Sequence, residues 1–176
     1  MSQMSTYPQE PAEFDTRKFR QTLGHFATGV TIITARSGDR LAGVTANSFN
    51  SVSLDPPLIL WSINKTSRSF PVFRDASHFA VNVLASDQIQ LSNRFARSSD
   101  DKFAGVAAVE GLGGCKLFEG VSATFQCEHH SMVDAGDHWI FLGKVVTFQA
   151  ENRAPLLYHQ GSYSMVTPHP DLALGV

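Results

Sequence analysis

The sequence has few cysteines, no long apolar run and no excess of charge of one sign. Its 176 residues include two cysteines, 14 basic residues and 16 acidic residues, which gives a formal net charge of −2. Because these charges are scattered along the chain, we expect no surface for nucleic acid. The apolar stretches are far shorter than the roughly 20 residues that span a bilayer, and the N-terminus lacks the pattern of a signal peptide. These absences predict a soluble cytoplasmic protein with no nucleic-acid or membrane partner.

Motifs for metal, disulfide and nucleotide chemistry are also missing. Cys115 and Cys127 match no zinc or thioredoxin spacing, and a reducing compartment would keep them as thiols. Cys127, His129 and His130 could suggest a metal site, but neighbouring residues of a strand point to opposite faces, so we expect no metal. The glycine-rich turn of Rossmann domains, the Walker loop and the nucleophile elbow are absent. A dinucleotide would therefore have to bind without a Rossmann domain.

The length and composition fit one globular domain with a sizeable core, since 43% of the residues are hydrophobic. Residues 1–13 are polar and contain two prolines, which predicts a flexible N-terminal arm. Residues 14–167 are expected to form the domain, and residues 168–176 a short C-terminal tail.

Hydrophobic periodicity predicts mostly strands with a few helices. Asp15 is a candidate N-cap for an amphipathic helix that we expect to end at Gly29. Two further helices are predicted over 67–73 and 86–95, the second capped at Ser86 and Asp87, and a glycine-rich loop is expected over 98–114.

Segments rich in β-branched and aromatic residues, separated by turn formers, predict the strands. These segments are Val30 to Ala35, Leu41 to Ala46, Leu58 to Ile63, Phe79 to Leu84, Val121 to Cys127 and Trp139 to Phe148. Six or more strands with few helices favour a closed barrel, because closure removes exposed strand edges.

The most informative stretch lies at the end of a predicted strand, where small hydroxyl and amide residues crowd together. Backbone N–H groups beside small side chains can approach a flat ring such as a flavin closely, and Thr45 to Ser48 with Ser51 and Val52 could form such an edge. The alternative is a turn held by local side-chain to backbone hydrogen bonds.

A second stretch, 61–69, combines two cations with several hydroxyl groups at the end of a strand and the start of a helix. Such helix starts bind phosphate groups, although a capped helix with solvated charges is the more common explanation. His138, at the start of a strand, carries little weight by itself.

Five motifs, taken in order, resemble the flavin reductase family, which supplies reduced flavin to two-component flavin-dependent monooxygenases. The resemblance extends from about Phe14 to Val166. Its motifs are 26–31, 45–49 with 51–53 and Pro56-Pro57, 79–84, Gly136-Asp137-His138, and 155–158 with 161–163. One such motif would be weak evidence, but five in this order form a specific pattern.

The resemblance implies a mainly β fold, namely an FMN-binding split β-barrel of Greek-key type with a few flanking helices. It also implies a homodimer with FMN or FAD near the subunit interface, NADH as co-substrate with NADPH as the alternative, and a flavin-dependent oxygenase as partner. Neither the dimer nor the split barrel follows from periodicity.

The resemblance further assigns roles to individual residues. Thr45, Ala46, Asn47, Ser48, Ser51 and Val52 would line the flavin ring, and Ser62, Lys65 and Ser67 would hold the ribityl phosphate region. Phe95 and Ala96 would close over the flavin tail. His138, the candidate catalytic residue, and Tyr163 would face the nicotinamide. Trp139 is bulkier than expected directly after the histidine, which could reshape the nicotinamide site.

Two other functions remain open from the sequence. One is a flavin carrier or sensor that uses the same barrel without catalysis. The other is a split-barrel oxidase of a phosphorylated vitamin, which would need a cluster of basic residues at the substrate phosphate. We find no second basic cluster beyond Lys65 and Arg68, which ranks the oxidase last.

Overall fold

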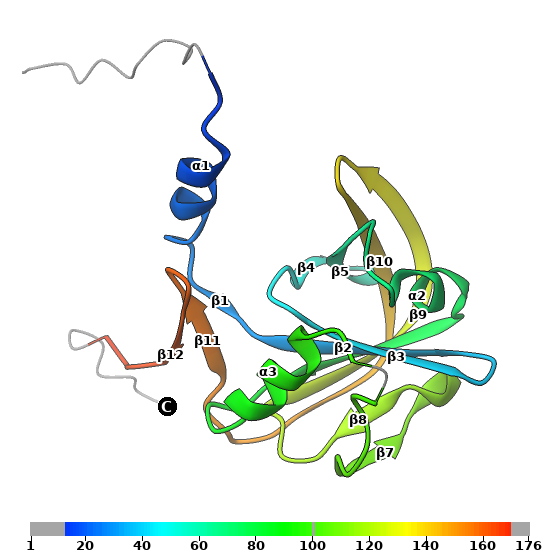
Figure 1. Ribbon diagram of the computed structural model, residues 1–176. Helices are drawn as coiled ribbons and strands as arrows, with labels where there is room; N and C mark the ends of the chain where they lie inside the picture. The colour runs from blue at the N-terminus through cyan, green and yellow to red at the C-terminus, as the bar shows by residue number, and fades with distance from the viewer. Residues whose placement is uncertain (1–12, 100, 170–176) are drawn as a thin grey trace, which may run out of the picture.

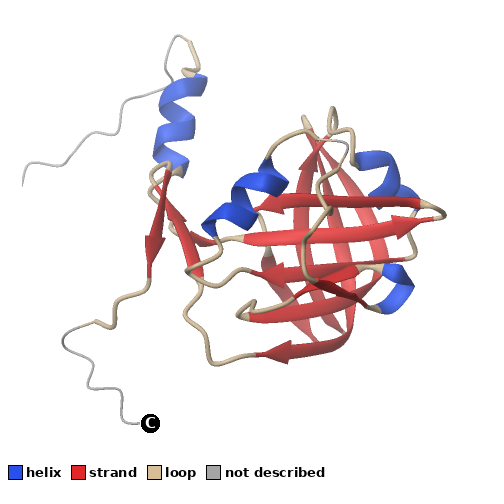
Figure 2. Ribbon diagram, turned by 60° about the horizontal axis from the view of Figure 1, so that its bottom comes forward, coloured by secondary structure: helices blue, strands red, loops and turns tan. Residues whose placement is uncertain are grey.

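A seven-stranded antiparallel sheet forms the body of the protein. The computed structural model describes residues 13–99 and 101–169. The sheet runs in the order β3-β2-β6-β9-β10-β5-β4 and curls into a barrel (Figures 1 and 2). Its strands are β2 (Thr31–Ser37), β3 (Arg40–Ala46), β4 (Asn50–Leu54), β5 (Pro57–Asn64), β6 (His78–Val83), β9 (Ala123–Ala135) and β10 (His138–Ala150). All six predicted strands are confirmed, whereas β4 and the strands outside this sheet were missed.

Smaller elements lie around this barrel. A three-stranded sheet projects from it together with helix α1 (Figure 2), and a two-stranded ribbon packs against β2 and β6, where Thr34 and Asn82 donate to the Lys116 carbonyl oxygen. The projecting elements are α1 (Thr16–Leu23), β1 (Thr28–Gly29), β11 (Leu156–His159) and β12 (Ser162–Met165). The others are α2 (Phe70–Asp75), α3 (Ile89–Ala96), β7 (Ala108–Glu110), η1 (Leu112–Gly114) and β8 (Lys116–Phe118).

Aromatic packing fills the barrel interior. The Trp61 ring is fully buried and stacks on Phe141, with ring centroids 4.9 Å apart. Because side chains alternate along a strand, β5 sends Ile59, Trp61 and Ile63 into the core and leaves Ser62 to the opposite face. One strand therefore supplies both the core and a polar surface.

Helix α1 begins as predicted but ends earlier. The Asp15 carboxylate accepts hydrogen bonds from the backbone N–H groups of Arg17 and Lys18 at 2.9 Å, which confirms the N-cap. The predicted end at Gly29 is wrong, since the helix ends at Leu23 and residues 28–29 pair with β11 instead. The strand partner of residues 28–29 is distant in sequence, so helical spacing alone could not show it.

The predicted start of α3 is also wrong. The helix begins at Ile89 after Gln88, whose side-chain oxygen accepts a hydrogen bond from the backbone of Ala85 at 2.9 Å. Asp87, expected as part of the cap, pairs with Arg153 at 2.6 Å. Helix α2 runs from Phe70 to Asp75 rather than over 67–73. The expected loop over 98–114 contains β7 and η1.

Some expectations concern parts of the chain that the structure describes only in part. Of the predicted arm, 1–13, only Glu13 is described, and of the tail, 168–176, only residues 168–169. Within the described ranges, no helix is long and apolar enough to cross a membrane. Cys115 and Cys127 are free and buried, and burial raises the pKa of the Cys115 thiol to about 11 and that of Cys127 to about 12.

Gly143 tests the packing of the barrel. A Cβ atom at this position would lie 2.3 Å from Cζ of Phe79 and 2.9 Å from Cβ of Cys127. Because both neighbours are buried, Gly143→Ala should lower the free energy of unfolding by about 1–3 kcal/mol through overpacking. Gly29→Ala is the matched control, since a Cβ there meets nothing within 4 Å. Denaturant titration measures both variants, and equal stabilities would contradict this packing.

Candidate active site

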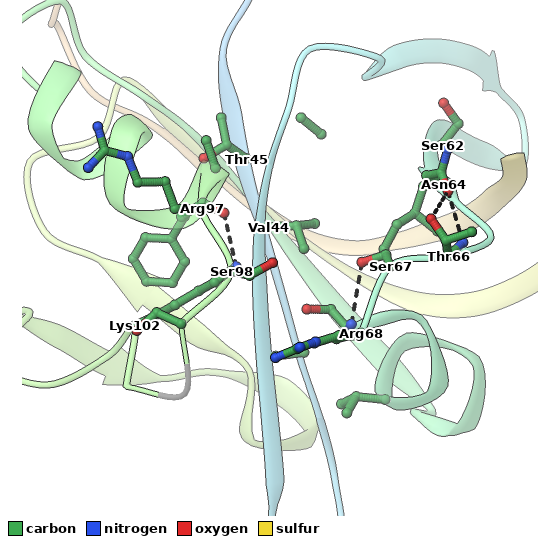
Figure 3. Close-up of a pocket in the computed structure, with 18 of the residues that line it drawn as sticks. Val44, Thr45, Ser62, Asn64, Thr66, Ser67, Arg68, Arg97, Ser98 and Lys102 are labelled. Carbon is green, nitrogen blue, oxygen red and sulfur yellow. Dashed lines mark hydrogen bonds between the residues drawn. The ribbon is translucent and has the colours of Figure 1, made fainter.

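A cavity of about 910 Å³ opens between strands β3 and β5 (Figure 3). Strand β3 is an edge of the seven-stranded sheet, and β5 pairs with β4 and β10. The barrel is therefore not closed by a ladder between β3 and β5, and the cavity lies along this gap. Most of its lining comes from three segments: β3 with Asn47 and Ser48, residues 62–64 with 66–69, and residues 95–99 with Lys102.

Side-chain hydrogen bonds hold the end of β3 in place. Ser48 Oγ accepts a hydrogen bond from the backbone N–H of Ser62 at 2.9 Å and lies 3.2 Å from the Ser62 carbonyl oxygen, to which it donates. On the other side, the Thr45 hydroxyl donates to the Ser92 carbonyl of α3 at 2.7 Å. The strand end is thus fixed to β5 and to α3 at once.

The segment after β5 presents hydroxyl groups and a cation to the cavity. Asn64 Oδ1 accepts hydrogen bonds from the backbone N–H and the hydroxyl of Thr66, at 2.8 and 2.6 Å. Ser67 Oγ accepts from the Ser69 N–H at 3.3 Å. These local bonds shape the turn, and Arg68 extends from it into the region of the cavity (Figure 3).

Helix α3 and the residues after it form the opposite wall, which two cations fasten. Lys102 Nζ donates to the carbonyl oxygens of Gly43 and Phe95, at 3.0 and 3.1 Å, and burial lowers the pKa of this ammonium group. Arg94 donates to the carbonyl oxygens of Asp101 and Ala104. These acceptors are uncharged carbonyls, so fastening the wall does not neutralise either cation.

Gly43 lets this wall pack closely on β3. A Cβ atom there would lie 2.5 Å from the Phe95 ring and 2.8 Å from the Phe103 ring. A residue without a side chain is therefore required where the aromatic rings of the wall meet the strand.

The cavity is lined by positive charge. Its cations are Arg40, Arg68, Arg97 and Lys102, and no aspartate or glutamate lines it in the described part of the chain. Arg40 pairs with Asp75 at 3.2 Å. A smaller hollow of about 370 Å³ shares Arg97 with the cavity and adds Arg94. In a chain of net charge −2, this concentration of cations favours an anionic ligand such as a phosphate ester.

Nine of the predicted site residues line the cavity. They are Thr45, Ala46, Asn47, Ser48, Ser62, Ser67, Phe95, Ala96 and His138. Four other predicted site residues, all in the described part of the chain, do not line the cavity. They are Ser51, Val52, Lys65 and Tyr163. The sequence segments proposed from different parts of the chain thus converge on one place.

The four remaining residues have other surroundings. Ser51 and Val52 lie exposed on the edge strand β4. The Tyr163 hydroxyl lies 2.8 Å from Ser92 Oγ and donates to Asn93 Oδ1 at 3.0 Å, so it supports α3 from behind. The Lys65 ammonium group binds the Asp134 carboxylate at 2.6 Å.

His138 stands at the edge of the cavity on the first residue of β10, opposite Asn64 of β5. Its Nδ1 atom lies 2.7 Å from the Asp137 carboxylate, and the side chain is 40% exposed. The hydrogen bond from His138 lowers the pKa of Asp137 below its usual value. An imidazole held this way keeps its second nitrogen available for a ligand.

Sequence reasoning missed the cations in the last turn of α3 and just after it. Arg94, Arg97 and Lys102, with Ser98 and Ser99 between them, combine charges and hydroxyl groups as residues 61–69 do. The same signal was therefore present, and the expectation of no second basic cluster is wrong. The oxidase consequently has to be judged on other grounds, which comparison with known proteins provides.

The chain belongs to the flavin reductase family. A family model described as flavin reductase like domain matches residues 23–167. The mainly β split-barrel fold expected from the sequence is confirmed by solved flavin reductases of the same fold. The NADH:FAD oxidoreductase SgcE6 of Streptomyces globisporus C-1027, solved with NAD and FAD fragments, superposes with a TM-score of 0.84 at 37% identity, covering 89% of this chain and 96% of that one.

Curated relatives carry names of the same kind. The reductase component of a flavin-dependent trigonelline monooxygenase from Acinetobacter baylyi is 49% identical over 148 residues, which cover 84% of this chain and 48% of the relative. The FMN reductase (NADH) SmoA of Agrobacterium fabrum is 41% identical over 153 residues, which cover 87% of each chain. This chain thus spans about half the length of the first relative and most of the second. The vitamin oxidase finds no support in these names.

Proposed function

We propose that this protein is an NADH-dependent flavin reductase that transfers hydride to FMN or FAD and supplies the reduced flavin to a partner monooxygenase. The observation that carries the proposal is the cavity at the open side of the barrel, lined by cations and hydroxyl groups and by no described carboxylate. Relatives named as reductase components of monooxygenases support the same function.

The residues present fit a flavin nucleotide. A flat ring needs backbone groups beside small side chains, and the end of β3 from Thr45 to Ser48 offers them. A phosphate needs hydroxyl groups and cations, which Ser67 and Arg68 supply on one wall and Lys102 on the other. When bound, the flavin supplies the hydride acceptor and NADH the hydride.

The protein's own part is positioning rather than acid–base chemistry. Hydride transfer depends on contact between two rings in a site that excludes water, so no catalytic triad is required. His138, fixed through Nδ1 by Asp137, orients the nicotinamide amide group with its other nitrogen. The wall formed by α3 and Lys102 shields one side of the cavity from solvent.

The proposal is tested by NADH oxidation with purified protein, measured with FMN, with FAD and without added flavin. A reductase should oxidise NADH only when flavin is present, and bleach the flavin when oxygen is removed. Tight flavin binding without NADH-dependent bleaching would contradict the proposal and favour a carrier or sensor.

The cations that line the cavity should contribute to the affinity for the flavin phosphates. Arg68→Ala should weaken FMN and FAD alike by roughly tenfold to a hundredfold, as expected for loss of a hydrogen bond to a charged group. Arg97, which the cavity shares with the adjoining hollow, is placed to meet the second phosphate of FAD. Arg97→Ala should therefore weaken FAD more than FMN.

Riboflavin is the control ligand for both arginine variants, because it carries the same ring without phosphate. Fluorescence titration should give unchanged riboflavin affinity for both. Equal losses for riboflavin and FMN would mean that the arginines act on the ring or on the fold instead of on the phosphates.

We also propose that the protein is a homodimer whose interface includes α1. No residue of this helix is buried, and it projects from the barrel (Figures 1 and 2). Leu23 and Phe26 are 57% and 74% exposed, and Phe14 and Phe19 are exposed as well. Such an apolar surface on a projecting helix and its flanking residues is typical of a subunit contact, and a second copy of the chain is the partner that fits.

Sedimentation equilibrium tests the dimer. The unmodified protein should sediment with twice the mass of the chain, and Leu23→Asp combined with Phe26→Asp should shift it to the monomer. Val109→Asp serves as the control, since Val109 is an exposed apolar residue on β7, away from α1. A monomeric unmodified protein would refute this assembly.

A further inference from the structure

Lys65 makes three contacts with the hairpin that carries His138. Its backbone N–H donates to the Asp137 carbonyl oxygen at 3.0 Å. Its ammonium group binds the Asp134 carboxylate at 2.6 Å and lies 5.2 Å from the centroid of the Trp139 ring, a cation–π contact. Lys65, which directly follows β5, therefore contacts the β9–β10 hairpin on both sides of its turn.

The turn of the hairpin has a strand partner on one side only. β10 pairs with β5 from His138 onward, whereas β9 pairs with β6 only up to Glu128 (Figure 1). The turn residue Gly136 adopts a positive φ of 65° with nothing within 4 Å of its Cβ position. Trp139 also stacks on Phe70 of α2, with ring centroids 5.9 Å apart and nearly parallel planes. The turn is thus tied to the loop after β5 and to α2.

The same contacts distinguish Lys65 from the cations that line the cavity. The Lys65 ammonium group has a carboxylate partner at short distance, whereas Arg68, three residues later, lines the cavity. Breaking the Asp134 contact to reach a phosphate would leave that carboxylate without its cation. Lys65 is therefore better placed to act on the hairpin than on the flavin.

We propose that Lys65, with Asp134 and Trp139, is a clamp that positions His138 at the edge of the cavity and so sets the affinity for the nicotinamide co-substrate. Lys65 is a positioning residue, because it acts through the hairpin and touches neither the flavin ring nor the nicotinamide ring. The part that concerns NADH rests on the proposed reductase function, whereas the clamp itself does not.

The first measurement needs no enzymatic activity. Hydrogen exchange of the backbone amides of 133–139 should become several times faster in Lys65→Met, which keeps an apolar stem but loses the charge. Lys65→Arg should restore most of the protection, since arginine can bind the carboxylate and cover the indole. Lys144→Met, at an exposed lysine of the same strand β10, is the control for loss of charge and should match the unmodified protein.

The second measurement separates the two ligands. In Lys65→Met, the KM for NADH should rise about tenfold, as loss of one exposed ion pair and one cation–π contact together allows, while kcat and the Kd for FMN change less than about twofold. Lys65→Arg should return the KM toward the original value, and Lys144→Met should not change it.

The outcomes are distinguishable. Unchanged exchange at 133–139 in Lys65→Met would overturn the clamp. A loss of FMN affinity as large as that of Arg68→Ala would also overturn it, because Lys65 would then hold the flavin phosphate. If the unmodified protein fails to oxidise NADH with any flavin, the proposed function fails, and the exchange measurement still decides whether the clamp exists.

Discussion

The arrangement of the site depends on an edge strand that keeps one side unpaired. Strand β3 pairs with β2 only, and just beyond its end the side chain of Ser48 binds the backbone of Ser62 on β5. A fully closed barrel would have filled this space with hydrogen bonds and side chains. Because the gap stays open, backbone groups at the end of β3 border the cavity. The access of a ligand to the polar residues at this strand end therefore follows from the topology of the sheet.

The charge of the cavity follows from how its walls are fastened. Lys102 and Arg94 hold the segment after α3 through backbone carbonyls, which leaves their charges without carboxylate partners. Near the hairpin the chemistry is different, since Lys65 is paired with Asp134. The two lysines thus have different roles. Lys102 contributes charge to the wall of the cavity, and Lys65 fixes the position of the neighbouring hairpin turn.

Much of the fold was predictable because its strands carry a local signal. The apolar and aromatic residues from Leu58 to Ile63 mark β5, and hydroxyl and amide residues at 45–48 mark the strand end that borders the cavity. The rest depends on partners distant in sequence. Residues 28–29, beyond the end of α1, pair with β11, and the surroundings of Lys65 are set by a carboxylate 69 residues away. Lys65 and Arg68 look equivalent in the sequence, and only the folded hairpin distinguishes them.

A crystal structure of the protein with FMN would test most directly whether the gap between β3 and β5 is the flavin site. We expect the flavin ring beside Thr45 to Ser48, the phosphate within hydrogen-bonding distance of Ser67 and Arg68, and the Lys65 ammonium group still bound to Asp134. Flavin bound at another surface, or a phosphate held by Lys65 after release of Asp134, would contradict this expectation.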